Sequence, residues 1–184
     1  MDLKGDMNQN ELLLTKLKEY YGQNDYTELD KILKILNGES VISLRILDWF
    51  VTNYAKQKYV VYNLPNGTRF KVYTDYKLKL KAYSKKRFDP FCRWDKIVIP
   101  YRNNQSIQTT LGQLNFFKWV LEKDIIPYIE KDYRQIESDM NTRNSTSKQK
   151  GEVPNKTRKK REELSVAATK SIKKEDVVVD VGFA

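Results

Sequence analysis

The residues best suited to a chemical role lie between Lys77 and Tyr101, in KLKLKAYSKKRFDPFCRWDKIVIPY. Residues 56–102 hold thirteen Lys and Arg against three Asp and Glu, in a chain of 184 residues with a net charge of +10. Such a local excess of positive charge is typical of a surface that binds anions or acidic proteins. We therefore predict an anion- or partner-binding set: Lys77, Lys79, Lys81, Lys85, Lys86, Arg87, Arg93 and Lys96.

For any one of these cations, a plainer interpretation competes. Lysines on the solvated side of a sheet are common, and they also protect a sheet from edge-to-edge aggregation. That interpretation is weaker for the whole run, because only Asp89 and Asp95 offset it. The binding interpretation therefore rests on the density of the positive charge rather than on any single lysine.

Catalytic chemistry has little support in the sequence. Cys92 is the single cysteine and the chain has no histidine, so a thiolate activated by Arg87 or Arg93 would lack the usual base. We interpret Cys92 as a small buried side chain. Without histidine a zinc site is close to excluded, and no phosphate-binding glycine loop is present. We expect no enzyme activity, cofactor, metal or small-molecule substrate.

The RFDPFCRWD stretch should form an ordered loop. Asp89-Pro90 favours a turn, and Phe88, Phe91 and Trp94 can anchor it by packing. We expect Asp89 to pair with a neighbouring arginine and so to fix the loop.

Helical periodicity positions the first part of the chain. Apolar spacing predicts one helix ending at Gly22, a second from Asp25 or Thr27 to Asn37-Gly38, and a third from Val41 to about Lys56. The third is apolar nearly all round, so we expect Leu47, Phe50 and Val51 to be buried in the centre.

A period of two then predicts strands. Runs 59–62 and 69–83 flank Asn66-Gly67, a strong hairpin signal, and KIVIPY predicts a third strand. In this interpretation Leu78, Leu80 and Ala82 face the core and the lysines between them face solvent.

Two helices follow in the predicted fold. Thr110 with Gln113 indicates the start of one helix, and Pro127 opens the last. We thus predict an α+β domain over 1–140: a three-helix N-terminal segment, a three-stranded antiparallel sheet and two C-terminal helices. Residues 141–184 should be an extended basic tail ending in the strand-forming DVVVDVGFA.

Three blocks together resemble a small family of proteins from nucleocytoplasmic large DNA viruses, the giant viruses. They are LRILDWFVTNYAK (44–56), FKVYTDYKLKLKAYSKKRFDPFCRWDKI (70–97) and TTLGQLNFFKWVLEKDIIPYI (109–129), with SKKRFDPFCR as the most specific motif. The family carries no assigned activity, so the resemblance implies no catalytic residue. It implies a viral protein made in the host cytoplasm.

Two functions follow from these observations. The first is a minor capsid or cementing component of the virion, which binds acidic capsid proteins through a basic sheet face and the C-terminal arm. The second is a factor that binds viral DNA or RNA. No apolar run is long enough to span a bilayer, so we expect no membrane span.

Overall fold

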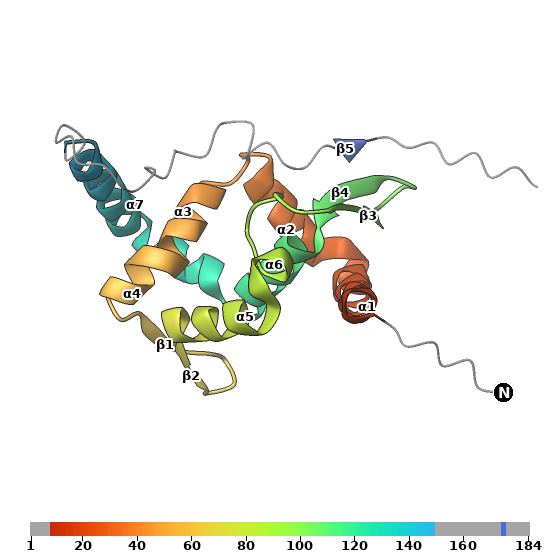
Figure 1. The fold of residues 1–184 in the computed structure, drawn as a ribbon, viewed down its shortest axis with the longest axis horizontal. Helices are drawn as coiled ribbons and strands as arrows, with labels where there is room; N and C mark the ends of the chain where they lie inside the picture. The colour runs from red at the N-terminus through yellow and green to blue at the C-terminus, as the bar shows by residue number, and fades with distance from the viewer. Residues whose placement is uncertain (1–7, 150–173, 176–184) are drawn as a thin grey trace, which may run out of the picture.

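The computed structural model describes residues 8–149 and 174–175, which combine helices with two β-hairpins (Figure 1). In Figure 1 the helix α1 lies at one side of the molecule and α7 at the other, and the two hairpins lie apart from each other.

The first helices follow the pattern that the sequence predicts. Helix α1 (Gln9–Gly22) begins with a capping box in which Asn8 and Glu11 exchange hydrogen bonds. A short 3-10 helix, η1 (Gln23–Tyr26), leads to α2 (Thr27–Leu36). The side chain of neither Asp25 nor Thr27 caps α2, whose N-cap is Tyr26.

The next helical segment changes its hydrogen-bond pattern along its length. It runs through α3 (Leu44–Trp49), the π-helix η2 (Phe50–Tyr54) and α4 (Ala55–Gln57). Leu47, Phe50 and Val51 are each 0% exposed, which confirms the predicted burial.

A hairpin of β1 (Val61–Asn63) and β2 (Arg69–Lys71) follows, with Val61 opposite Lys71. Gly67 lies in its turn at φ +79, a conformation that glycine adopts without steric cost. The Asn-Gly hairpin signal is thereby confirmed, although the second strand is short.

The predicted strand over 69–83 is wrong, because the chain after Lys71 forms helix α5 (Val72–Arg87). Val72, Tyr76, Leu80 and Tyr83 recur at helical spacing and face the molecule's interior. Leu78, which a strand would bury, is 61% exposed. The alternation of Lys and Leu over six residues resembles a strand locally, but Leu, Lys and Ala are good helix formers.

A second hairpin pairs β3 (Lys96–Pro100) with β4 (Ser106–Thr110), in register Ile97 to Thr109. The strand at KIVIPY is confirmed, whereas β4 was not predicted. Two residues of β5 (Lys174–Glu175) pair with Ser106 and Ile107 of β4.

The predicted fold, a three-helix N-terminal segment followed by a three-stranded antiparallel sheet and two C-terminal helices, is therefore wrong. Strands β1 and β2 form one sheet and β3 and β4 belong to another, and α5 separates them along the chain. No three-stranded sheet joins the strands that the sequence predicts.

Two helices complete the described fold. Helix α6 (Leu111–Glu122) begins at Thr110, whose side chain accepts a hydrogen bond from Gln113, as predicted. It is the most enclosed helix, since Phe116, Phe117 and Val120 are 0% exposed.

Helix α7 (Ile125–Gln149) continues past residue 140. The division of the chain at residue 140 stays a prediction. Apart from Lys174 and Glu175, the tail segments 150–173 and 176–184, including DVVVDVGFA, lie outside the described residues.

Candidate interaction surface

The outward face of α5 carries a row of exposed lysines, which we call the α5 stripe. Its members recur every three or four residues and are all exposed: Thr74, Lys77, Leu78, Lys81, Ala82 and Lys85. The helix breaks at Ser84 (φ 59, ψ 170), so Lys85 begins a short final turn. The stripe thus combines three cations with one exposed leucine and contains no acid.

No acidic side chain among the described residues forms a salt bridge with the lysines of the α5 stripe. Asp75, the nearest acid in sequence, accepts a hydrogen bond from Trp119 Nε1 at 2.6 Å. Lys77, Lys81 and Lys85 form no salt bridge within the described part of the chain. Their positive charge is therefore available to an external partner.

Lys79 does not belong to this face. Residues two positions apart on an α-helix point in directions that differ by about 200°. Lys79 therefore points away from Lys77 and Lys81, and it is half-buried. The strand interpretation grouped these three lysines, and the helix separates them.

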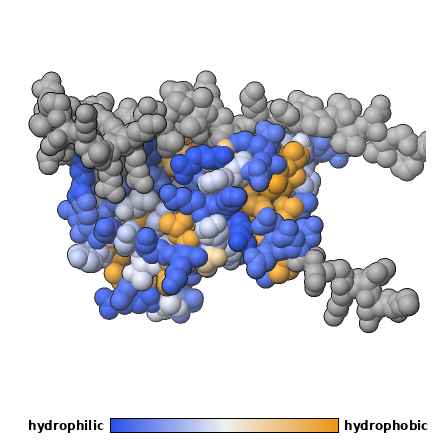
Figure 2. Space-filling view, in the orientation of Figure 1, coloured by the Kyte–Doolittle hydropathy of each residue, from blue (hydrophilic) through white to orange (hydrophobic). Residues whose placement is uncertain are grey.

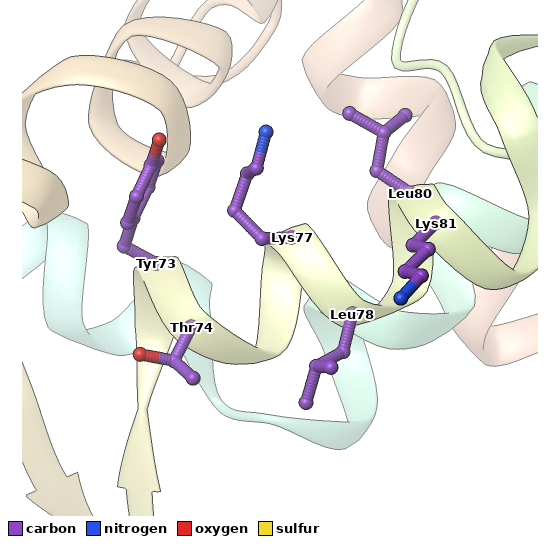
Figure 3. Close-up of a pocket in the computed structure, with 6 residues that line it drawn as sticks. All are labelled: Tyr73, Thr74, Lys77, Leu78, Leu80 and Lys81. Carbon is purple, nitrogen blue, oxygen red and sulfur yellow. The ribbon is translucent and has the colours of Figure 1, made fainter.

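A shallow hollow of about 580 Å³ runs along α5. Figure 3 shows its six lining side chains, all from α5: in that view Tyr73, Lys77 and Leu80 point up from the helix, and Thr74, Leu78 and Lys81 point down. A site lined by one helix lacks the enclosing walls that bury most small ligands. In Figure 2 this face is mostly hydrophilic, with smaller hydrophobic areas between polar ones. The face suits contact with a macromolecule better than capture of a metabolite.

Arg93 is engaged with Asp89, as the sequence predicted for a neighbouring arginine. The two residues form paired hydrogen bonds at 2.9 Å, and Asp89 is only 2% exposed. Hydrogen bonding to Asp89 raises the pKa of Arg93 above its usual value. Arg93 therefore stabilises the loop, and fewer of its N–H groups remain to bind an external anion.

The loop that follows α5 is attached to the start of α6. Asn115 Nδ2 donates to the carbonyl of Arg87 at 2.8 Å, and Gln113 Nε2 donates to that of Pro90 at 2.9 Å. The Asp89 N–H donates to the Gly112 carbonyl at 3.2 Å. Gln113 and Asn115 are buried polar residues whose amides satisfy the loop backbone.

The other predicted cations lie at separate places. Lys86 Nζ lies 5.9 Å from the centroid of the Trp94 ring, and Arg87 Nη1 donates to Gln9 Oε1 at 2.9 Å. Lys96 Nζ lies 2.9 Å from the Sγ of Cys92 and also donates to the Cys92 carbonyl. Cys92 is buried, 7% exposed. Of the predicted set, Lys77 and Lys81 lie one turn apart on α5 and line the same hollow, Lys85 follows the break at Ser84, and the others lie at separate places.

A group of cationic and aromatic side chains at the start of α5 is absent from the sequence predictions. Lys56 Nζ lies 5.7 Å from the centroid of Tyr73, and Tyr73 and Lys77 lie on the same side of α5 (Figure 3). Tyr59 is the most exposed of the large hydrophobic residues in the described chain, at 84%. The signal was present in KQKY, where an aromatic residue follows two lysines.

A metal centre finds no support in the described chain. Residues 8–149 and 174–175 contain no cluster of three or more Cys, Asp or Glu suited to a metal ion. Over the same residues, no helix combines the length and the apolar character that crossing a membrane requires.

The sequence also matches a known family profile. Residues 1–181 match the family of unknown function DUF7197. The chain belongs to this family. Because the function of the DUF7197 family is unknown, membership assigns no role to the residues above. That SKKRFDPFCR is a family signature stays a prediction.

A relative of this DUF7197 chain is the uncharacterized protein L507 of Acanthamoeba polyphaga mimivirus. The two are 42% identical over 146 residues, which cover 75% of this chain and 56% of the mimivirus protein. The similarity supports a viral origin, as the resemblance to giant-virus proteins implied. No solved structure matches the chain.

Proposed function

We propose that this chain is a non-enzymatic component of the virion, a minor capsid or cementing protein that binds an acidic protein surface through the α5 stripe. The sheet face of the original hypothesis is replaced by a helix face. The host cytoplasm would be the place of synthesis and assembly.

One observation carries the proposal. Lys77, Lys81 and Lys85 are exposed along α5, with Lys85 just past the break at Ser84, and none of them pairs with an acid within the described residues. Leu78, 61% exposed between them, supplies an apolar contact of the kind found at the centre of protein interfaces. Complementary charge around such a contact gives specificity and fast association.

The experiment compares two variants of equal charge. K77E/K81E/K85E reverses the stripe, whereas K18E/K34E/K131E reverses three exposed lysines on α1, α2 and α7. Virus carrying each variant is purified, and the chain is quantified in particles by mass spectrometry. We expect the stripe variant to be lost from particles and the control to remain.

Nuclease treatment separates protein contact from nucleic-acid contact. A chain held by capsid protein stays with the shells after the genome is digested, whereas a DNA-binding protein is released. Absence of the wild-type chain from purified particles would contradict the proposal. So would tight binding to duplex DNA with a salt dependence equivalent to about six or more phosphates.

A further inference from the structure

Tyr59 occupies a position where tyrosine costs stability. It follows the end of α4 in the left-handed conformation, at φ 48, and the Val60 N–H donates to the Ala55 carbonyl at 3.2 Å. This is the hydrogen bond of a helix end at which glycine is the preferred residue, because a side chain crowds the backbone there. A bulky residue at such a φ is unusual.

The Tyr59 side chain offers no compensating contact within the described chain. It is 84% exposed and forms no hydrogen bond or ring contact with a described residue. Tyr59 therefore departs from the glycine preference of this helix end without a gain in packing. Such a departure is expected where a residue serves binding rather than stability.

Its surroundings indicate the kind of partner. The Val72 N–H donates to the Val60 carbonyl at 3.2 Å, which continues the β1–β2 pairing by one step and places Tyr59 and Tyr73 at the same end of the ladder. Lys56 Nζ lies over the Tyr73 ring, and Lys77 is one helical turn beyond Tyr73. We call this group the Tyr59 corner: Lys56, Lys58, Tyr59, Tyr73 and Lys77.

The charge of the corner is one-sided. Residues 55–77, which hold the corner, contain five Lys and Arg and one acid, Asp75, whose carboxylate accepts a hydrogen bond from Trp119. Aromatic side chains among lysines are the elements with which proteins bind single-stranded nucleic acid, since bases stack on the rings and phosphates lie against the cations. A duplex offers no unstacked base to Tyr59.

We infer that the Tyr59 corner binds single-stranded nucleic acid, with one base stacked on the Tyr59 ring. The surface is distinct from the α5 stripe except for Lys77, and it does not depend on the proposed virion role.

The test uses the full chain and a fluorescein-labelled single strand of about 20 thymidines, with binding followed by fluorescence anisotropy. Y59G should weaken binding by at least about fivefold, the lower range for loss of one stacked base. The same variant should raise the midpoint of thermal unfolding by about 2 °C, because glycine relieves the backbone. Lost binding with gained stability cannot result from unfolding.

Paired variants identify the ring as the cause. Y59F keeps the ring and should bind like the wild type, whereas Y59L is apolar without a ring and should bind like Y59G. K56E should weaken binding of the single strand. The double variant K81E/K85E should lower retention in particles. In the K81E/K85E background, the ratio of the affinities measured with Tyr59 and with Y59G should be unchanged. Equal binding of Y59G and wild type would overturn the inference, as would equal affinity for a duplex of the same length.

Discussion

Arg93 and Asp89 form a two-point ion pair within the most basic segment of the chain: Nε lies 2.9 Å from Oδ2 and Nη2 lies 2.9 Å from Oδ1. The Phe91 N–H also donates to Asp89 Oδ1, at 3.3 Å. Such paired geometry is the strong form of the carboxylate–guanidinium contact. Arg93, the second arginine of SKKRFDPFCR, therefore helps to hold the loop together, and fewer cations of the basic segment are available to a partner than its composition suggests.

Replacement of Asp89 by asparagine should lower the free energy of unfolding by about 2 kcal/mol, because hydrogen bonds to a charged partner are lost at a buried site. Chemical denaturation of the purified chain measures the change. Asp95→Asn is the matched control, since Asp95 is exposed and should change stability by less than about 0.5 kcal/mol. Equal effects at the two positions would show that the ion pair does not hold the loop.

Gly112→Ala should destabilise the chain by about 1–3 kcal/mol, the usual cost of overpacking. A Cβ at Gly112 would lie 3.0 Å from the Lys86 carbonyl oxygen and 3.3 Å from the Phe88 nitrogen, both backbone atoms. Gly22→Ala is the control, because nothing lies within 4 Å of its added Cβ. We expect Gly22→Ala to keep or slightly raise the melting temperature, and a Gly112→Ala variant as stable as the control would be inconsistent with the close approach of loop and α6.

Leucine truncation distinguishes the helix at 72–87 from the strand that the sequence suggested. Leu47 is 0% exposed, so Leu47→Ala should cost about 2–5 kcal/mol. Leu78→Ala should cost less than about 0.5 kcal/mol, since that side chain is 61% exposed. A large loss at Leu78, measured by urea denaturation, would instead support a strand with a buried leucine face.

Alkaline pH should unfold the chain through its tyrosines. Burial raises the pKa of Tyr20, Tyr76 and Tyr128 from 10.0 to about 12. The neutral phenol is therefore favoured in the folded state. Its contribution is complete below pH 10, the value for the unfolded chain, and is lost as the pH rises to about 12.

Phenolate absorbance and circular dichroism, followed together, test this expectation. We expect ionisation of these tyrosines and loss of helical signal to coincide between pH 10 and 12. Full tyrosine ionisation near pH 10 with an intact helical signal would show that the rings are accessible.

Local patterns predicted those features whose cause is local. The largely apolar character of the helix predicted from Val41 to about Lys56 predicted burial of Phe50, Asn66-Gly67 predicted the first hairpin, and Asp89 was expected to meet an arginine. Each depends on residues that are near one another in sequence.

Features that depend on distant partners were beyond local patterns. Helix α5 is selected by contact of Tyr76 and Leu80 with other elements, which outweighs the alternation of Lys77 to Ala82. Arg87 donates a hydrogen bond to Gln9, which lies 78 residues away in sequence. No local pattern could therefore indicate that Arg87 is engaged within the chain.

The attachment of the loop to α6 also bears on the entropy of association. A surface whose cations extend from a loose loop must become ordered on binding, and each immobilised side chain and backbone segment then weakens the complex. Here Asn115 and Gln113 hold the backbone of residues 87–90 in the unbound chain. Most of that ordering is complete before a partner arrives. The ordered loop fixes the end of α5, so selectivity follows from spacing, because a partner must match the positions of Lys77 and Lys81 on that helix.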